Sequence, residues 1–169
     1  MKQIEVDILF TADDIQKAYE IHLSKIQPLK SRILLILGVL LIIMGLFLVF
    51  LQNIANNINW TSWAFIIYGV LVLFYYFWKY KKMGISAYKN LVEFQHPFKY
   101  TFTSEKLFLT GKNSSSDLNW EHYEFAIVTK NIILLYPNKL RFTIFPAKYF
   151  TPDEFQTLTK WIKEKVKCK

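Results

Sequence analysis

The sequence predicts a helical membrane hairpin joined to an α+β domain, in which an antiparallel sheet is closed by a C-terminal helix. Three observations predict this class. Two apolar runs of nineteen residues follow each other closely, at residues 33–51 and 60–78. No Asp, Glu, Lys or Arg occurs between residues 33 and 78, and the whole net charge of +8 lies after this stretch. Short alternating segments then precede one helical pattern that begins at Thr151.

Both apolar runs have the length of a membrane span. They read ILLILGVLLIIMGLFLVFL and WTSWAFIIYGVLVLFYYFW. At about 1.5 Å per residue, a helix of this length nearly matches a hydrocarbon core of about 30 Å. A cleaved signal peptide would be shorter and nearer the N-terminus. A buried helix pair in a soluble protein would need a larger core than the remaining residues supply. We therefore expect two transmembrane helices.

The loop between the spans, residues 52–59, predicts their orientation. It reads QNIANNIN and holds no charged residue. Basic residues flank the pair instead, with Arg32 before the first span and Lys79 just after the second. Because such residues are retained on the cytoplasmic side, we expect the loop to be external and both termini to be cytoplasmic.

The spans have the character of an anchor. Neither contains Asp, Glu, Lys, Arg or His, the residues that mark ion and proton pathways inside membranes. Gly38, Gly45 and Gly69 favour a close approach of the two helices. Association into a homo-oligomer is compatible with this pattern.

The N-terminal segment, residues 1–32, predicts a cytoplasmic strand and an amphipathic helix. Apolar residues alternate from residue 4, as in a half-buried strand. Thr11 and Asp14 have the spacing of a capping box, and Pro28 ends or kinks the helix before the membrane. This strand can pair with the C-terminal sheet, since both ends are expected on one side.

Residues 79–169 predict a basic linker helix followed by the sheet domain. The expected elements are a helix over 79–93, a hairpin over 98–110 that turns at Ser104-Glu105, a loop GKNSSS, strands over 119–129, 132–136 and 140–145 with a turn at Pro137-Asn138, and a helix that begins at Thr151-Pro152 with Glu154 completing its cap. The continuously apolar IILLY segment should be the central strand.

The chain resembles the YcxB-like family of bacterial membrane proteins. The resemblance rests on the two spans, Trp120 in LNWEHYEFAIV, the IILLY segment, and FTIFPAKYF with Pro146, Lys148 and Phe150 before a capped helix. Where members often have a basic residue directly after the proline, this chain has Ala147. The resemblance implies a pleckstrin-homology-like (PH-like) cytoplasmic domain and a bacterial plasma membrane, and it brings no catalytic residues. We expect Trp120, Pro146 and Phe150 to be structural.

Basic residues of the sheet domain are the candidate contacts. They are Lys99, Lys106, Lys112, Lys130, Lys139, Arg141 and Lys148. A segment tethered to a bilayer meets acidic headgroups first, and each lysine near an anionic leaflet contributes about 1 kcal/mol. Membrane lipids or a protein partner are therefore expected rather than a nucleic acid. The alternative is that these charges only keep an aromatic-rich domain soluble.

The sequence offers no pattern for catalysis, a cofactor or a metal. A single cysteine, Cys168, excludes an internal disulfide and a multi-cysteine zinc site. The three histidines lie far apart in sequence, and the cluster of Glu121, His122 and Glu124 has no nucleophile beside it. We expect no catalytic, cofactor-binding or metal-ligating residues.

These observations lead to two functional hypotheses. The first is a non-enzymatic, membrane-anchored binding or scaffold module that presents its basic domain to a protein partner or to anionic lipid headgroups. The alternative is an immunity-type or inhibitory membrane protein that neutralises a specific toxin or enzyme. An enzyme ranks below both because the sequence lacks a convergent polar constellation.

Overall fold

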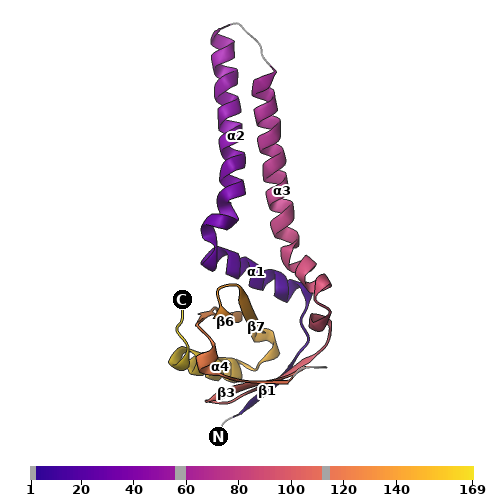
Figure 1. Ribbon diagram of the computed structural model, residues 1–169, viewed down its shortest axis with the longest axis vertical. Coiled ribbons are helices and arrows are strands. Elements are labelled where there is room, and N and C mark those ends of the chain that lie inside the picture. The colour runs from indigo at the N-terminus through magenta and orange to yellow at the C-terminus, as the bar shows by residue number, and fades with distance from the viewer. Residues whose placement is uncertain (1–2, 56–59, 112–114) are drawn as a thin grey trace. The chain divides into compact units, whose positions relative to one another are not determined.

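A computed structural model describes residues 3–55, 60–111 and 115–169 of the chain (Figure 1). The chain forms two compact units. One comprises residues 19–83, and the other combines residues 1–18 with residues 84–169. Residues 56–59 of the expected external loop lie outside the described residues.

The first unit contains the long helix α2 (Pro28–Ile54) and most of the long helix α3 (Thr61–Asn90), as far as residue 83. They cover the predicted spans except Trp60. In the most apolar window of each helix only 11% of the residues are buried. A core helix of a soluble protein would be mostly buried. Both helices are long and apolar enough to cross a membrane, and most of their residues are not buried.

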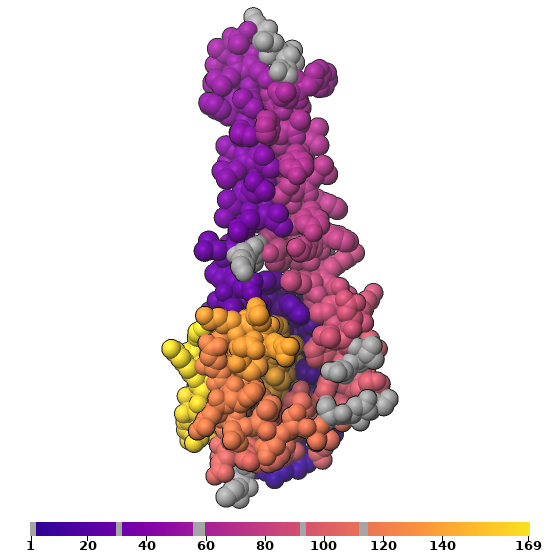
Figure 2. All heavy atoms as spheres, viewed as in Figure 1, coloured from indigo at the N-terminus to yellow at the C-terminus, as the bar shows by residue number. Residues whose placement is uncertain are grey.

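Glycines allow α2 and α3 to lie close together, and the two helices pack side by side along their length (Figure 2). A Cβ atom on Gly69 would lie 2.8 Å from the carbonyl oxygen of Gly38, and one on Gly45 would lie 2.9 Å from that of Ser62. Only a residue without a side chain fits such contacts. The predicted close approach at Gly38, Gly45 and Gly69 is confirmed.

The second unit contains two antiparallel sheets, where the sequence had predicted one. The first has the order β1-β2-β3-β4 and the second the order β5-β6-β7. The strands are β1 (Ile4–Ile8), β2 (Phe98–Phe102), β3 (Lys106–Thr110), β4 (Ser115–Asn119), β5 (Phe125–Val128), β6 (Ile132–Asn138) and β7 (Arg141–Pro146). A 3₁₀ turn at Trp120–His122 separates β4 from β5, so these two strands do not pair and the prediction of a single sheet is wrong.

Aromatic side chains from both sheets meet in the core of this unit. The ring of Phe145 on β7 lies 5.1 Å from that of Phe102 and 5.2 Å from that of Tyr100, both on β2, in edge-to-face contacts. Helix α4 (Pro152–Lys165) adds Leu158 and Ile162, which are fully buried. The core is therefore shared by both sheets and the C-terminal helix.

Several elements match the predictions. β2 and β3 form the expected hairpin, β6 with its buried IILLY segment is central in its sheet, and Thr151 begins α4 with a complete capping box. Helix α1 (Ala12–Ile26) follows Thr11, whose hydroxyl accepts from the Asp14 backbone at 3.3 Å. Strand β1 pairs with β2 as expected.

Three local predictions are wrong. Of the strand expected over 119–129, Asn119 ends β4 and only 125–128 form β5. Ser115 and Ser116 of the expected loop belong to β4, in which Leu118 is the only apolar residue. Pro137 and Asn138 end β6, and the turn follows at Lys139–Leu140. The Asn138 side chain stabilises this turn by accepting hydrogen bonds from the backbone of Leu140 and Arg141.

The last turns of α3 belong to the second unit, and Gly84 packs there against α1. The Gly84 N–H donates to Gln16 Oε1 at 2.8 Å, and a Cβ atom on Gly84 would lie 2.5 Å from the backbone nitrogen of Gln16. Two helix backbones therefore touch at a position that only glycine can occupy. This contact joins segments that precede and follow the hairpin.

Replacing Gly84 by alanine should destabilise the domain by about 1–3 kcal/mol, because the added methyl group overlaps backbone atoms that cannot move independently. Thermal unfolding in detergent, followed by near-UV circular dichroism, measures the change. Ser86→Ala is the matched control, since Ser86 is exposed on the same helix. Equal melting temperatures for both variants would contradict the close contact.

Candidate functional site

The structure divides the basic candidate residues by their partners. Three of them form ion pairs: Lys99 with Glu5 at 3.2 Å, Lys106 with Asp117 at 3.0 Å, and Lys148 with Asp14 at 2.8 Å. Lys112 lies outside the described residues. Charges that already have a carboxylate partner contribute little to attraction of an anionic surface.

Lys130, Lys139 and Arg141 form no ion pair with any residue in the described part of the chain. They lie at opposite ends of the same sheet. Lys130 is in the β5–β6 turn, whereas Lys139 is in the β6–β7 turn and Arg141 begins β7. With about 3.3 Å per strand residue, the length of β6 separates the two turns by roughly 20 Å. The candidates therefore do not form one basic patch.

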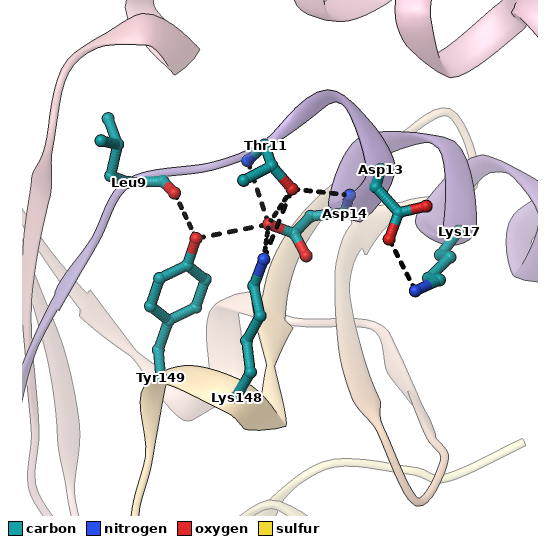
Figure 3. Close-up of polar contacts among 7 residues, drawn as sticks. All are labelled: Leu9, Thr11, Asp13, Asp14, Lys17, Lys148 and Tyr149. Carbon is teal, nitrogen blue, oxygen red and sulfur yellow. Dashed lines mark hydrogen bonds and ion pairs between the residues drawn. The ribbon is translucent and has the colours of Figure 1, made fainter.

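Asp14 is the centre of a polar cluster that joins the start of α1 to the segment after β7 (Figure 3). Its side chain is only 5% exposed and accepts from Lys148 Nζ and from the Thr11 backbone at 3.0 Å. The Tyr149 hydroxyl donates to the carbonyl oxygen of Leu9 and lies 3.3 Å from the same Asp14 oxygen. Lys148 and Tyr149 thus hold the N-terminal segment, although they lie more than 130 residues later in the sequence.

The charge state of the cluster follows from these contacts. Burial would raise the pKa of Asp14, but the hydrogen bonds from Lys148 and Thr11 outweigh burial and hold this pKa below its ordinary value of 3.8. Burial would lower the pKa of Lys148, but its hydrogen bond and charge interaction with Asp14 raise it above the ordinary 10.5. Both groups are therefore charged at neutral pH.

The family-motif residues lie in or beside the core. Trp120 is buried in the 3₁₀ turn, and its Nε1 donates to the carbonyl oxygen of Thr103 at 3.3 Å. Pro146 ends β7 opposite Ile132. Proline has no backbone N–H, and the pairing of β6 with β7 needs none at this position. Phe150 is buried with its ring 5.8 Å from that of Phe102. These positions hold the sheets and α4 together.

A groove between α4 and the β5–β6 turn is the candidate binding site. It has a volume of about 760 Å³. The lining residues are Val128, Thr129, Lys130, Ala147, Phe150, Pro152, Phe155, Gln156, Thr159 and Lys163. The residues from α4 recur at the spacing of one helix face, adjacent to the buried face of Leu158 and Ile162. The groove is thus a surface of the domain with an apolar floor and two lysines.

The lining determines which chemistry the groove can perform. It offers apolar side chains, two threonine hydroxyls, one amide and two ammonium groups, and no Asp, Glu, His or Cys is among its described residues. Elsewhere in the described ranges, no group of three or more His, Cys, Asp or Glu residues is placed to hold a metal ion. Glu121, His122 and Glu124 are exposed around the 3₁₀ turn, not along the strand that was expected.

Two features of these sites were not predicted from the sequence. The ion pair of Asp14 with Lys148 joins residues 134 positions apart, and only the cap at Thr11 and the family motif marked its two ends. Lys163, which is not among the basic candidates of the sheet domain, lines the groove. The helical spacing of Phe155, Thr159 and Lys163 indicates that the three residues share one face of α4. It does not indicate that the β5–β6 turn forms the other side of the groove.

The fold defines a class of protein: a helical hairpin long and apolar enough to span a membrane, attached to an antiparallel two-sheet domain closed by a C-terminal helix. Residues 102–162 match the family described as YcxB-like protein, which confirms the resemblance over this part of the chain. No match was found among curated proteins or among solved structures.

Replacing Asp14 by asparagine should lower the free energy of unfolding at pH 7 by about 1–3 kcal/mol, because a buried charged acceptor of several hydrogen bonds is lost. The folded carboxylate has a lowered pKa, so its contribution is present above the ordinary value and disappears as the pH falls through the folded pKa. The stability difference between variant and wild type should therefore shrink below pH 3.8. Chemical denaturation in detergent across pH measures it.

Asp13→Asn is the control for this experiment, since Asp13 is the sequence neighbour and pairs with Lys17 on the exposed surface. Its effect should remain within about 0.5 kcal/mol. If Asp14→Asn were as mild as Asp13→Asn at every pH, the cluster would not stabilise the junction.

Proposed function

We propose that this chain is a membrane-anchored, non-enzymatic binding module. Its two spans anchor it in the bacterial plasma membrane, and a PH-like domain on the cytoplasmic face presents a binding surface to a protein partner. Both termini are cytoplasmic in this proposal, and the loop between the spans is external.

The observation that carries the proposal is the pairing of β1 with β2. β1 precedes the hairpin and β2 follows it, and five residue pairs join them in one antiparallel ladder. Two strands that pair in one sheet must lie on the same side of a bilayer. A small open sheet cannot lie within the hydrocarbon region, because the backbone groups at its edges would have no hydrogen-bond partners there. An even number of crossings meets this requirement, and the basic flanks favour the cytoplasmic side.

The strand arrangement supports a PH-like domain. A sheet of four antiparallel strands and a sheet of three share one aromatic core, and a single helix follows the last strand. In this proposal the first strand is separated from the other six by the membrane hairpin. The anchor is thus an insertion into the domain, with a covalent connection on each side.

The distribution of charge favours a protein partner over a lipid or nucleic-acid phosphate surface. Attraction to a charged plane needs several unpaired cations on one face. The candidates that the structure describes are instead divided between ion pairs and opposite ends of β6. The groove beside α4 combines an apolar floor with two cations, which suits a segment of a protein.

Labelling of cysteines with a membrane-impermeant maleimide tests the proposed arrangement. Native Cys168 is exposed on the domain and can therefore react with the reagent. Because the domain is cytoplasmic in this proposal, Cys168 should react only after spheroplasts are permeabilised. In a Cys168→Ser background, a cysteine introduced as Asn53→Cys at the end of α2 should react in intact spheroplasts. The same reagent thus compares the loop side with the domain side in matched single-cysteine proteins.

The opposite pattern, with Cys168 labelled in intact spheroplasts and the loop cysteine protected, would overturn the cytoplasmic placement. Release of the full-length protein from washed membranes by carbonate would overturn the anchor.

A further inference from the structure

We propose that the outer edge of β5 and the groove beside α4 form one docking site for an extended acidic segment of a partner protein, which displaces residues 167–169 from that edge. This inference rests on the proposed function and specifies the chemistry of the partner.

The edge of β5 already carries a strand. The Ala126 N–H donates to the carbonyl oxygen of Lys167 at 2.8 Å, and the Lys169 N–H donates to that of Ala126 at 2.9 Å. Cys168 lies parallel to Ala126 as an isolated bridge. β5 is the outermost strand of its sheet. The chain therefore demonstrates that this edge accepts an added extended segment.

The same edge continues into the groove at Val128. Backbone groups alternate in direction along an antiparallel ladder, so the N–H and C=O of Val128 point the same way as those of Ala126. Val128 faces Ile133 of β6 in the register and also lines the groove. A segment that replaces residues 167–169 would gain backbone hydrogen bonds at both positions. In the described part of the chain, residues 167–169 make such bonds along this edge only at Ala126.

The opposite wall supplies sites for side chains. Phe155 and Phe150 form its aromatic part, with ring centroids 5.9 Å apart, and Gln156 and Thr159 follow along α4. An extended segment directs every second side chain to one side. Alternate apolar residues would thus lie over the aromatic rings, while the others face outward.

The positive charge at the groove favours a negatively charged partner segment. Lys130 and Lys163 are both exposed at the groove, and neither forms an ion pair with any residue that the structure describes. Residues 167–169, Lys-Cys-Lys, have the same positive sign. They are held by two backbone bonds and by the Lys169 ammonium 3.8 Å from the centre of the Phe125 ring. An acidic segment complements the lysines where this basic segment does not.

A defined peptide tests the site on the full-length protein in phosphatidylcholine nanodiscs. The probe is a fluorescein-labelled octapeptide in which valine and glutamate alternate, and fluorescence anisotropy reports its binding. Two control peptides carry lysine in place of glutamate, or N-methyl groups on alternate amides that prevent strand pairing. Only the unmodified acidic peptide should bind.

Variants of the protein locate the peptide. Lys130→Gln and Lys163→Gln should each weaken binding by about two- to fivefold at low salt. Lys139→Gln removes an equivalent charge at the other end of β6 and should leave binding unchanged. A chain that ends at Val166 should bind about tenfold more tightly, because no residues need to be displaced from Ala126.

Equal binding of the N-methylated peptide would overturn strand addition, and a Lys139→Gln effect as large as that of Lys163→Gln would overturn the location. If nanodiscs with phosphatidylglycerol competed fully with the peptide, the site would serve a headgroup and the proposal would be wrong. The cysteine-labelling pattern does not depend on peptide binding, so these failures differ from failure of the proposed function.

Discussion

The antiparallel pairing of β1 with β2 is the constraint on which the rest of this structure depends. It places Ile4 opposite Phe102 and Ile8 opposite Phe98, and both isoleucines are buried. Without β1, the edge of β2 and part of the aromatic core would be exposed to water. The domain is therefore completed by a segment that lies before the hairpin, and a fragment that begins after α3 would lack one of its seven strands.

The N-terminal segment is held at more than one point, which explains how five residues of strand suffice. The polar cluster of Asp14 and Lys148 joins the start of α1 to the segment after β7, and Gly84 brings the end of α3 against the same helix. The β1–β2 pairing, the Asp14 cluster and the Gly84 contact all restrain β1 and the start of α1. The effects of mutations at these contacts on stability should therefore depend on one another. The segments that precede and follow the hairpin in sequence are thus held to each other within the second unit.

Much of the fold could be predicted because its signals are local. Apolar length identified both long helices, alternation identified the β-hairpin at Phe102 and Leu107, and the Thr151 cap identified α4. β4 was missed because Ser115–Asn119 has little apolar alternation, and its order comes from pairing with β3. The division into two sheets and the groove at Lys163 depend on how distant segments pack, which no local pattern contains.

A disulfide between β1 and β2 tests the central claim most directly. In a Cys168→Ser background, cysteines introduced as Glu5→Cys and Thr101→Cys occupy directly opposite positions in the register, where Cβ atoms lie about 4.5–5.5 Å apart. Phe108→Cys replaces Thr101→Cys in the control, since it lies one strand further and about 10 Å from residue 5. The account predicts rapid intramolecular oxidation in native membranes for the first pair only. Failure of that pair to crosslink, or crosslinking only between separate chains, would contradict it.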